Sequence, residues 1–210
     1  MTKWDSEHLG PVEESAVKEL SNIGLGHAVT ALSDLTGRSF NMTVPSVTTV
    51  GLESIPYLLG SPDETTVGIY MAVEGDLTGH LAFLFPWASA QNLWNMLLGT
   101  APVTPCDVDP LCASAILEIG NIINSSFLNA ISDMCDLKLH ATPPLVSVDS
   151  CAAIAGTVTV EAELANAVAL SIETSIFESD SKQTQGYFLC IPTLDGLELL
   201  FQRLGLREAA

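Results

Sequence analysis

Two long segments of the chain place apolar residues at helical spacing, and each is predicted to form a helix. The first spans 11–36 and the second spans 110–135. Asp109 stands where an N-cap belongs, and Pro110 occupies the first helical position, where a missing N–H is tolerated. The apolar positions are Ala16, Val17, Leu20, Ile23 and Ala31 in the first helix, and Ala115, Ile116, Ile119, Ile122, Ile123, Phe127 and Ala130 in the second. One face of each helix is therefore expected to pack against a core.

Shorter patterns follow each helix in the same order. After the first helix come a β-like piece, a short helix, two strands joined by a turn, and an amphipathic helix, at 39–44, 52–60, 64–73, 77–85 and 87–99. The second half repeats that order at 137–141, 155–164, 166–177, 186–192 and 193–205. Alternating helices and adjacent strand pairs indicate an α+β fold, with a mostly antiparallel sheet flanked by the two long helices.

The two halves are copies of one unit. The positions that are identical at a constant offset of 99 residues include Ser15 and Ser114, Glu19 and Glu118, Asn22 and Asn121, Ala31 and Ala130, Ser33 and Ser132, Asp34 and Asp133, Pro45 and Pro144. We therefore expect an internally duplicated, pseudo-two-fold unit. It would be a single domain over 1–210, with repeats at about 11–103 and 108–205 and the Pro-rich stretch 99–110 as linker.

A polar stripe runs along each long helix, opposite its apolar positions. At 100° per residue, Ser15, Glu19 and Asn22 fall within about 60° of one another. One turn beyond them lies Gly26, although Gly costs a helix about 1 kcal/mol relative to Ala. The second helix repeats the stripe with Ser114, Glu118, Asn121 and Ser125. Small residues beside a carboxylate and an amide let another molecule approach the helix, which favours a docking surface over an ordinary solvated face.

Composition argues against several other kinds of site. Twenty-five acidic against seven basic residues give a net charge of −18, which disfavours nucleic acid and anionic membranes as partners. No apolar run reaches the roughly 18 to 20 residues that span a bilayer, and the N-terminus has no basic-then-apolar pattern, so a cytoplasmic protein is expected. The five cysteines form no C-x-x-C pair and the four histidines are scattered, so neither a disulfide framework nor a metal site is predicted.

A carboxylate and an amide three residues apart have a limited chemistry. They offer no nucleophile and no histidine base, and the chain has no glycine-rich phosphate loop. A carboxylate binds a cation, whereas an amide both donates to and accepts from a water molecule. Such a pair can complete the active site of another protein by positioning, which is most of what phosphoryl transfer to water requires.

At these residues the chain resembles the CheC family of chemotaxis phosphatases, whose relatives include CheX, FliY and FliM. The family signature is Asp or Ser, three residues, Glu, two residues, Asn, twenty-two residues and Pro. The signature occurs twice, at Ser15, Glu19, Asn22 and Pro45, and at Ser114, Glu118, Asn121 and Pro144. Two intact copies resemble CheC more than the single-site CheX, and no further switch domain follows, as FliY would require.

The resemblance implies that the chain dephosphorylates the phosphorylated response regulator CheY. Glu19 and Glu118 would contact the active-site Lys of the regulator. Asn22 and Asn121 would orient the water that attacks the aspartyl phosphate. The residues that would line the two sites in support are Ser15, Gly26, Ser114 and Ser125. The Mg²⁺ would belong to the regulator, and this chain would bind no cofactor of its own.

The resemblance also implies a second partner, the deamidase CheD, which in the family binds near the short helix after the second Pro. The stretch at that place, 147–156, is short and weakly helical by its pattern, whereas 52–59 in the first half is the fuller helix. The pattern therefore argues against CheD binding.

Two other classes of function stay open. A non-catalytic adaptor or switch-like protein would capture the phosphorylated regulator or CheD without hydrolysing anything. A small-molecule enzyme would use His27, His80 or His140, none of which has a partner at a readable spacing. Of these, His27 lies towards the apolar side of its helix and is expected to be buried.

The two stripes differ in one neighbour. Lys18 in the first copy stands where Leu117 stands in the second. A positive charge beside Glu19 would partly neutralise that carboxylate and weaken its hold on the Lys of a regulator. The second site is therefore predicted to be the more active one.

Overall fold

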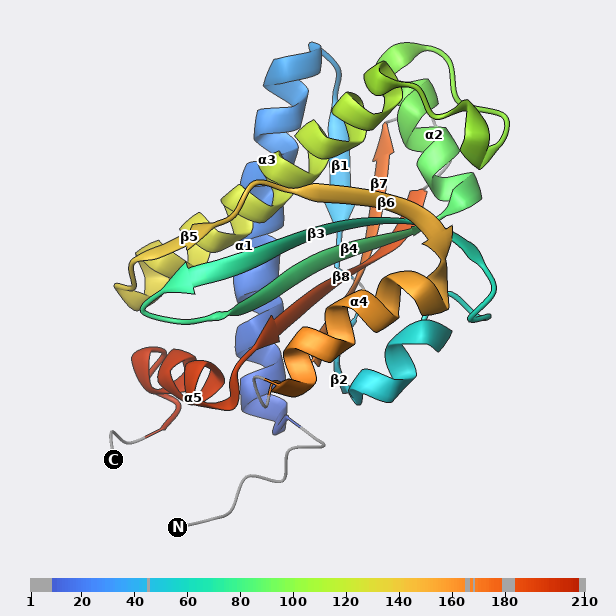
Figure 1. Ribbon diagram of the computed structural model, residues 1–210. Helices are drawn as coiled ribbons and strands as arrows, with labels where there is room; N and C mark the ends of the chain where they lie inside the picture. Colours follow the sequence, from blue (N-terminus) through green and yellow to red (C-terminus); the bar gives the residue numbers. More distant parts are fainter. Residues whose placement is uncertain (1–8, 45, 165–166, 168, 179–183, 208–210) are drawn as a thin grey trace.

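The computed structural model describes residues 9–44, 46–164, 167, 169–178 and 184–207. Within these residues, eight strands form one antiparallel sheet (Figure 1). The strands are β1 (Phe40–Thr43), β2 (Val47–Val50), β3 (Thr65–Gly75), β4 (Gly79–Pro86), β5 (Leu139–Ala141), β6 (Leu145–Ser150), β7 (Ala169–Glu178) and β8 (Thr184–Pro192). The helices are α1 (Pro11–Thr36), α2 (Trp87–Leu98), α3 (Pro110–Cys135), α4 (Cys151–Leu164) and α5 (Leu194–Arg203), with 3₁₀ turns η1 (Leu52–Tyr57) and η2 (Pro105–Asp107).

Strands from the two halves interleave in this sheet. β4 and β8, the second strands of the two hairpins, pair at its centre with Leu81 opposite Cys190. β1 and β2 of the first half pair with β7 of the second, while β5 and β6 of the second half pair with β3 of the first. The predicted α+β fold with a duplicated antiparallel sheet is confirmed. Each half completes the sheet of the other, which is what a single unit built from two repeats requires.

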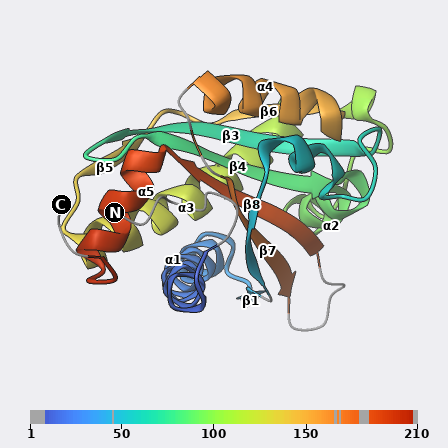
Figure 2. The ribbon, with the colours of Figure 1, turned by 90° about the horizontal axis from the view of Figure 1, so that it is seen from below.

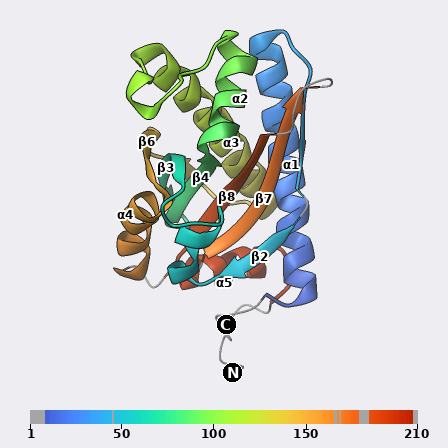
Figure 3. The same ribbon diagram turned by 90° about the vertical axis from the view of Figure 1, so that its right-hand side faces the viewer.

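The sheet lies between two helical layers (Figures 2 and 3). α1 and α3 cover one face, and α4 with η1 covers the other. The larger core fills the space between the sheet and α1 and α3, where the ring of Phe127 on α3 meets that of Phe188 on β8 edge to face at 4.7 Å. A smaller core lies under α4 and includes Ile55, Leu84 and Ile154. The sides of α1 and α3 that face away from the sheet are left at the surface.

α1 and α3 approach each other closely at Gly24. A Cβ atom on Gly24 would lie 2.8 Å from the Cα of Phe127, which is closer than such atoms come in folded proteins. The contact is with backbone, so no side-chain rotation relieves it. Gly26, two residues on, has open space where a Cβ would stand.

These two glycines give a matched test of the helix crossing. We expect Gly24→Ala to lower the free energy of unfolding by about 1–3 kcal/mol, because the added methyl overpacks a rigid contact. Gly26→Ala should raise it by up to about 1 kcal/mol through helix propensity alone. Urea denaturation measures both, and equal shifts for the two variants would contradict this account of the crossing.

The sequence predicted both long helices with the bounds that the structure shows, 11–36 and 110–135. The predicted N-cap is also confirmed, since Asp109 Oδ1 accepts a hydrogen bond of 2.8 Å from the N–H of Cys112. That N–H holds the pKa of the Asp109 carboxyl below its usual value. The predicted hairpins and their closing helices lie at β3–β4–α2 and β7–β8–α5.

Two parts of the sequence interpretation are wrong. The short strands β2 and β6 were not expected, and they exist because they pair with β7 and β3. The helix after Pro144 is not short: α4 covers Cys151–Leu164, whereas the first-half stretch that was expected to be fuller is only the 3₁₀ turn η1, with Pro56 inside it. The β-branched residues of α4 favour a strand, but Ile154, Ala155 and Val158 recur on one helical face and pack on the sheet.

The buried face of α1 is turned relative to the expected one. Its buried residues include Leu25 and Leu32, which lie about 120–140° beyond the centre of the apolar set used for the prediction. His27 and Ala31 are therefore exposed, and the expectation that His27 is buried is wrong. The polar stripe stays on the solvent side after this correction.

α3 is also long and apolar enough to cross a membrane, with a mean hydropathy of 1.4 over its richest window. Of that window, 44% is buried inside the fold. A core helix of a soluble protein passes the same test, so length and composition alone do not make α3 a membrane span.

Candidate functional site

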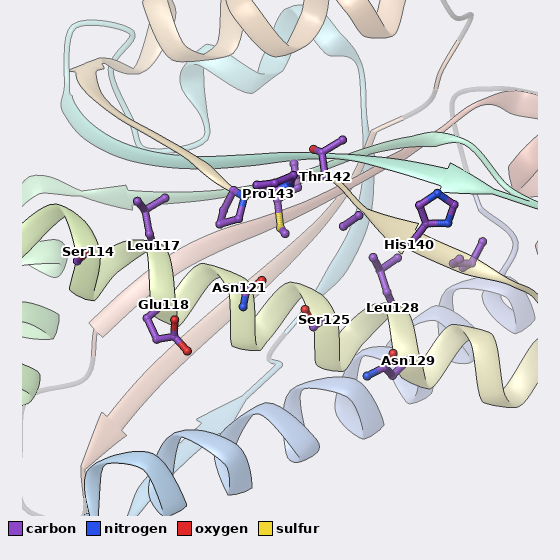
Figure 4. A pocket seen from close by; sticks show the side chains of 14 residues that line it. Ser114, Leu117, Glu118, Asn121, Ser125, Leu128, Asn129, His140, Thr142 and Pro143 are labelled. Atoms are coloured by element: carbon purple, nitrogen blue, oxygen red, sulfur yellow. The ribbon is translucent and has the colours of Figure 1, made fainter.

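The polar stripe of α3 lies at the surface as the helical phase predicted. Ser114, Glu118 and Asn121 are exposed and Ser125 is half-buried, one above another along the helix (Figure 4). The opposite face of α3 is held in the core by residues such as Ile116. Because the helix is anchored at its N-cap and along this face, the stripe has a fixed orientation.

The stripe forms one wall of a cavity of about 650 Å³. The opposite wall is the segment of β5 and its continuation to Pro144 (Figure 4). The full lining is Met71, Ser114, Leu117, Glu118, Asn121, Ser125, Leu128, Asn129, Leu139, His140, Ala141, Thr142, Pro143 and Pro144. Pro144, which follows Asn121 by 23 residues in the sequence motif, thus meets Glu118 and Asn121 at one site.

The spacing between Asn121 and Pro144 follows from this geometry. Beyond Asn121, α3 continues for about 21 Å until it ends at Cys135. The chain then reverses at Asp136, whose φ of 50° is left-handed. The extended run from Lys138 to Pro144 returns about 20 Å alongside the helix. Pro144 therefore stands across the cavity from Asn121, and a different spacing would place it elsewhere.

Hydrogen bonds to β3 hold the opposite wall in place. The N–H of Thr142 donates to the carbonyl of Ala72 at 2.9 Å, and the Ala72 N–H donates to Thr142 Oγ1 at 3.0 Å. Near the end of this strand, His140 Nε2 lies 3.3 Å from Glu74 Oε2. The cavity is therefore framed by a strand and a helix rather than by a loose loop.

Asn124 supports the floor of the cavity and was not singled out from the sequence. It is fully buried, and its Nδ2 donates to Met71 Sδ at 2.7 Å. Its Oδ1 is buried with no hydrogen-bond partner among the described residues. The offset of 99 aligns Asn124 with Leu25, so a polar residue at an otherwise apolar position was a usable signal. Beneath the second site, a buried polar side chain therefore bonds to a residue of the cavity lining, whereas the first copy has a leucine at the equivalent position.

The first stripe has the same exposed character on α1. Ser15, Glu19, Asn22 and Gly26 are all exposed. Pro45, the last residue of its motif, lies outside the described residues. A Cβ added at Gly26 would meet no atom within 4 Å, so the surface there is open to the close approach of another molecule.

The cysteines do not supply a nucleophile to either stripe. Cys112, Cys135, Cys151 and Cys190 are buried, and Cys106 is exposed on η2. Burial raises the pKa of Cys190 to about 12, and burial likewise raises the pKa of the other three buried thiols. Reactive cysteines need a lowered pKa, so these thiols are structural.

The histidines and acids form no metal centre in the described part of the chain: no group of three or more His, Cys, Asp or Glu gathers there. The hydroxyl of Tyr70 lies 2.7 Å from His80 Nδ1, away from the stripes. His140, for which sequence spacing indicated no partner, has one in Glu74 and lines the cavity of Glu118 and Asn121.

Comparisons with known proteins agree on one family. The model of the CheC-like family matches residues 12–48 and 112–148, which are the segments that contain the two stripes. Over 192 residues, the chain is 31% identical to the CheY-P phosphatase CheC of Bacillus subtilis (strain 168), with 90% of this chain and 92% of that protein covered.

Solved structures share the fold at low sequence identity. Thermotoga maritima FliY matches with a TM-score of 0.74 at 16% identity, covering 95% of this chain and 99% of that one. The middle domain of FliM from Vibrio alginolyticus matches with a TM-score of 0.63 at 12% identity, covering 88% and 98%. Both likenesses concern the fold as a whole.

Proposed function

Because the chain belongs to the CheC-like family, we propose that it is a phosphatase that accelerates hydrolysis of the aspartyl phosphate on a CheY-type chemotaxis response regulator. The observation that carries this proposal is the repeated stripe of an exposed carboxylate and an exposed amide, one copy of which borders a cavity of about 650 Å³. The B. subtilis relative is named for the same activity, which supports the assignment.

The stripe contributes to the reaction by positioning. A water molecule attacks phosphorus in line, the bond from phosphorus to the aspartyl oxygen breaks, and the products are inorganic phosphate and a free carboxylate. Asn22 or Asn121 would orient that water, since an amide both accepts from and donates to it. Glu19 or Glu118 would bind the Lys of the regulator and so set the distance of the amide from phosphorus.

The neighbouring small residues allow the approach that this chemistry needs. The supporting residues are Ser15 and Gly26 on α1, and Ser114 and Ser125 on α3. The regulator would provide the carboxylate that carries the phosphoryl group and the Mg²⁺ that balances its charge. No step is assigned to a metal or cofactor on this chain.

Turnover distinguishes this proposal from a non-catalytic adaptor. A ³²P-labelled, phosphorylated CheY-type regulator should release phosphate at a rate proportional to the amount of added chain, even when the chain is present at one tenth of the regulator concentration. Tight binding of the phosphorylated regulator with no faster release would exclude the phosphatase and favour the adaptor.

The two sites are predicted to contribute unequally. Asn121→Ala should lower the rate of phosphate release more than Asn22→Ala, because Lys18 stands beside Glu19 whereas Leu117 stands beside Glu118. The buried support at Asn124 exists only in the second copy and favours the same order. The measurement is the rate of phosphate release by the two single variants at equal concentration. A larger loss of rate from Asn22→Ala would contradict the prediction that the second site is the more active one.

We also propose a CheD-binding surface on the α4 side of the sheet. The full length of α4 removes the objection raised by the weak helical pattern of 147–156. A cavity of about 470 Å³ lies beside α4, with Leu145 on its rim 65% exposed. Ala153→Arg, an exposed position on α4, should abolish binding of purified CheD while phosphate release is unchanged. An unaltered dissociation constant for CheD would exclude this surface.

The location that fits these partners is the cytoplasm, where response regulators of chemotaxis act. Retention of the chain in the soluble fraction after cell lysis is the expected result, and its recovery with the membranes in high salt would contradict that location.

A further inference from the structure

A small apolar hollow lies on the other side of Glu118 from the cavity. Its volume is about 130 Å³, close to the roughly 150 Å³ that suffices for a benzene-sized apolar group. It is lined by Leu32 and Leu35 of α1, Leu97 of α2, and Ala115, Glu118 and Ile119 of α3. Glu118 is the sole charged residue of this lining.

The hollow is continuous with the stripe because Glu118 borders both spaces. A partner whose cation reaches Glu118 can therefore lay its adjoining surface over the hollow. Leu35, at the end of α1, is 61% exposed and would be removed from water by that contact. Apolar burial of this kind stabilises a complex in proportion to the area covered.

A hydrogen bond joins the ends of α1 and α2 at the corner of the fold where the hollow lies. The guanidinium Nη1 of Arg38, just after α1, donates to the carbonyl of Met96 on α2. Leu97 follows Met96 and reaches the hollow from there. The corner is thus part of the folded framework.

The corner that corresponds to the first stripe has different residues, which come from the second repeat. The offset of 99 pairs Leu35 with Met134, which is 42% exposed. The helices α2 and α5 occupy equivalent places in the two repeats, and α2 lies between Pro86 and Gly99 as α5 lies between Pro192 and Gly205. Because these two intervals are equally long, Leu97 on α2 is equivalent to Arg203 on α5. The positive charge of Arg203 acts on Cys135 at the end of α3, so α5 brings a cation to the place where α2 brings a leucine.

We propose that the hollow beside Glu118 is a docking subsite for an apolar side chain of the phosphorylated regulator, next to the cation that Glu118 binds. The charge of Glu118 and the apolar walls around it fit a partner surface in which a Lys and an apolar residue are neighbours. The subsite makes the second stripe the tighter-binding of the two. This inference rests on the proposed phosphatase function and names a contact that sets its KM.

The test isolates the second site by working in an Asn22→Ala background. Leu35→Glu should raise the KM for a phosphorylated CheY-type regulator by about tenfold, because burying a Leu side chain is worth about that factor in an equilibrium constant. The maximal rate should stay within twofold, since Leu35 does not touch the reacting atoms. Leu97→Arg, which introduces the residue found at the equivalent position 203, should shift KM in the same direction, and the conservative Leu35→Met should restore most of the parent value.

Met134→Glu is the matched control, because it makes the same kind of change at the position that the duplication pairs with Leu35, at the corner that corresponds to the first stripe. It should leave KM within twofold, and the unfolding midpoints of all variants should agree with that of the Asn22→Ala chain. A KM that neither Leu35→Glu nor Leu97→Arg changes, in a chain that still turns over, overturns the subsite and leaves the phosphatase function standing. Absence of turnover in the parent chain overturns both.

Discussion

A chain carrying both Asn22→Ala and Asn121→Ala is expected to lose phosphate release by about 100-fold or more while it still binds the phosphorylated regulator. The reason is that each amide positions a water and contributes little to holding the partner, which the neighbouring carboxylate does. Removing a positioning group of this kind typically costs about 10²–10³ in rate. The measurement is phosphate release at saturating regulator, together with binding of the BeF₃⁻–Mg²⁺ form of the regulator.

Ser33→Ala with Ser132→Ala serves as the control for this double variant. These serines are also paired by the duplication, but they lie seven residues beyond Gly26 and Ser125, where the stripes end, and each is half-buried. They should leave the rate within about twofold. If the double Asn variant hydrolyses as fast as the parent chain, the assignment of the amides is wrong whatever its binding shows.

Reversing the charge of Glu118 has the second large effect. In the Asn22→Ala background, Glu118→Lys should weaken binding of the phosphorylated regulator by roughly 30-fold or more. A favourable contact with the Lys of the regulator becomes a repulsive one, and losing one partner of a desolvated charge pair costs about 2–5 kcal/mol. Both the dissociation constant and the rate at low regulator concentration should report this change.

Asp133→Lys is the matched control for the reversal. Asp133 is an exposed acid on the same helix, but its position is about 100° away from the stripe. It changes the net charge by the same amount, so general electrostatic attraction between the two proteins is affected equally. Equal losses from Glu118→Lys and Asp133→Lys would mean that the partner senses overall charge rather than a specific carboxylate.

The stripes could be predicted from sequence because both of their determinants are local. Helical phase depends only on spacing, and the duplication marks which polar residues are repeated. The prediction that Glu19 and Glu118 face solvent is correct even though the buried face of α1 was predicted wrongly. Leu25 and Leu32 extend that buried face to one side, but they do not lie on the stripe.

The cavity could not be predicted in the same way because its second wall comes from tertiary pairing. Thr142 and His140 face α3 only because the register of β5 on β3 places them there. The hollow beside Glu118 likewise needs the ends of α1 and α2 to meet at Arg38. The repeated spacing in the sequence indicated that Pro144 belongs to the motif. It did not indicate that Pro144 lies across the cavity from Asn121.

The size of α4 illustrates the limit of local preference. Its Thr and Val residues favour a strand, and the sheet that the helix covers decides the outcome. Gly68 on β3 takes part in this contact, since a Cβ there would lie 2.6 Å from Ile154 Cγ2. Such a fit between distant segments is not visible in either segment alone.

The central claim is that water, positioned by this chain, attacks the phosphoryl group while that group is still on the regulator. Following the label from a ³²P-phosphorylated regulator in the presence of one tenth as much of this chain tests the claim most directly. All of the label should pass to inorganic phosphate over several turnovers, and none should be found on this chain. Label bound covalently to this chain, or label that stays on the regulator, would contradict it.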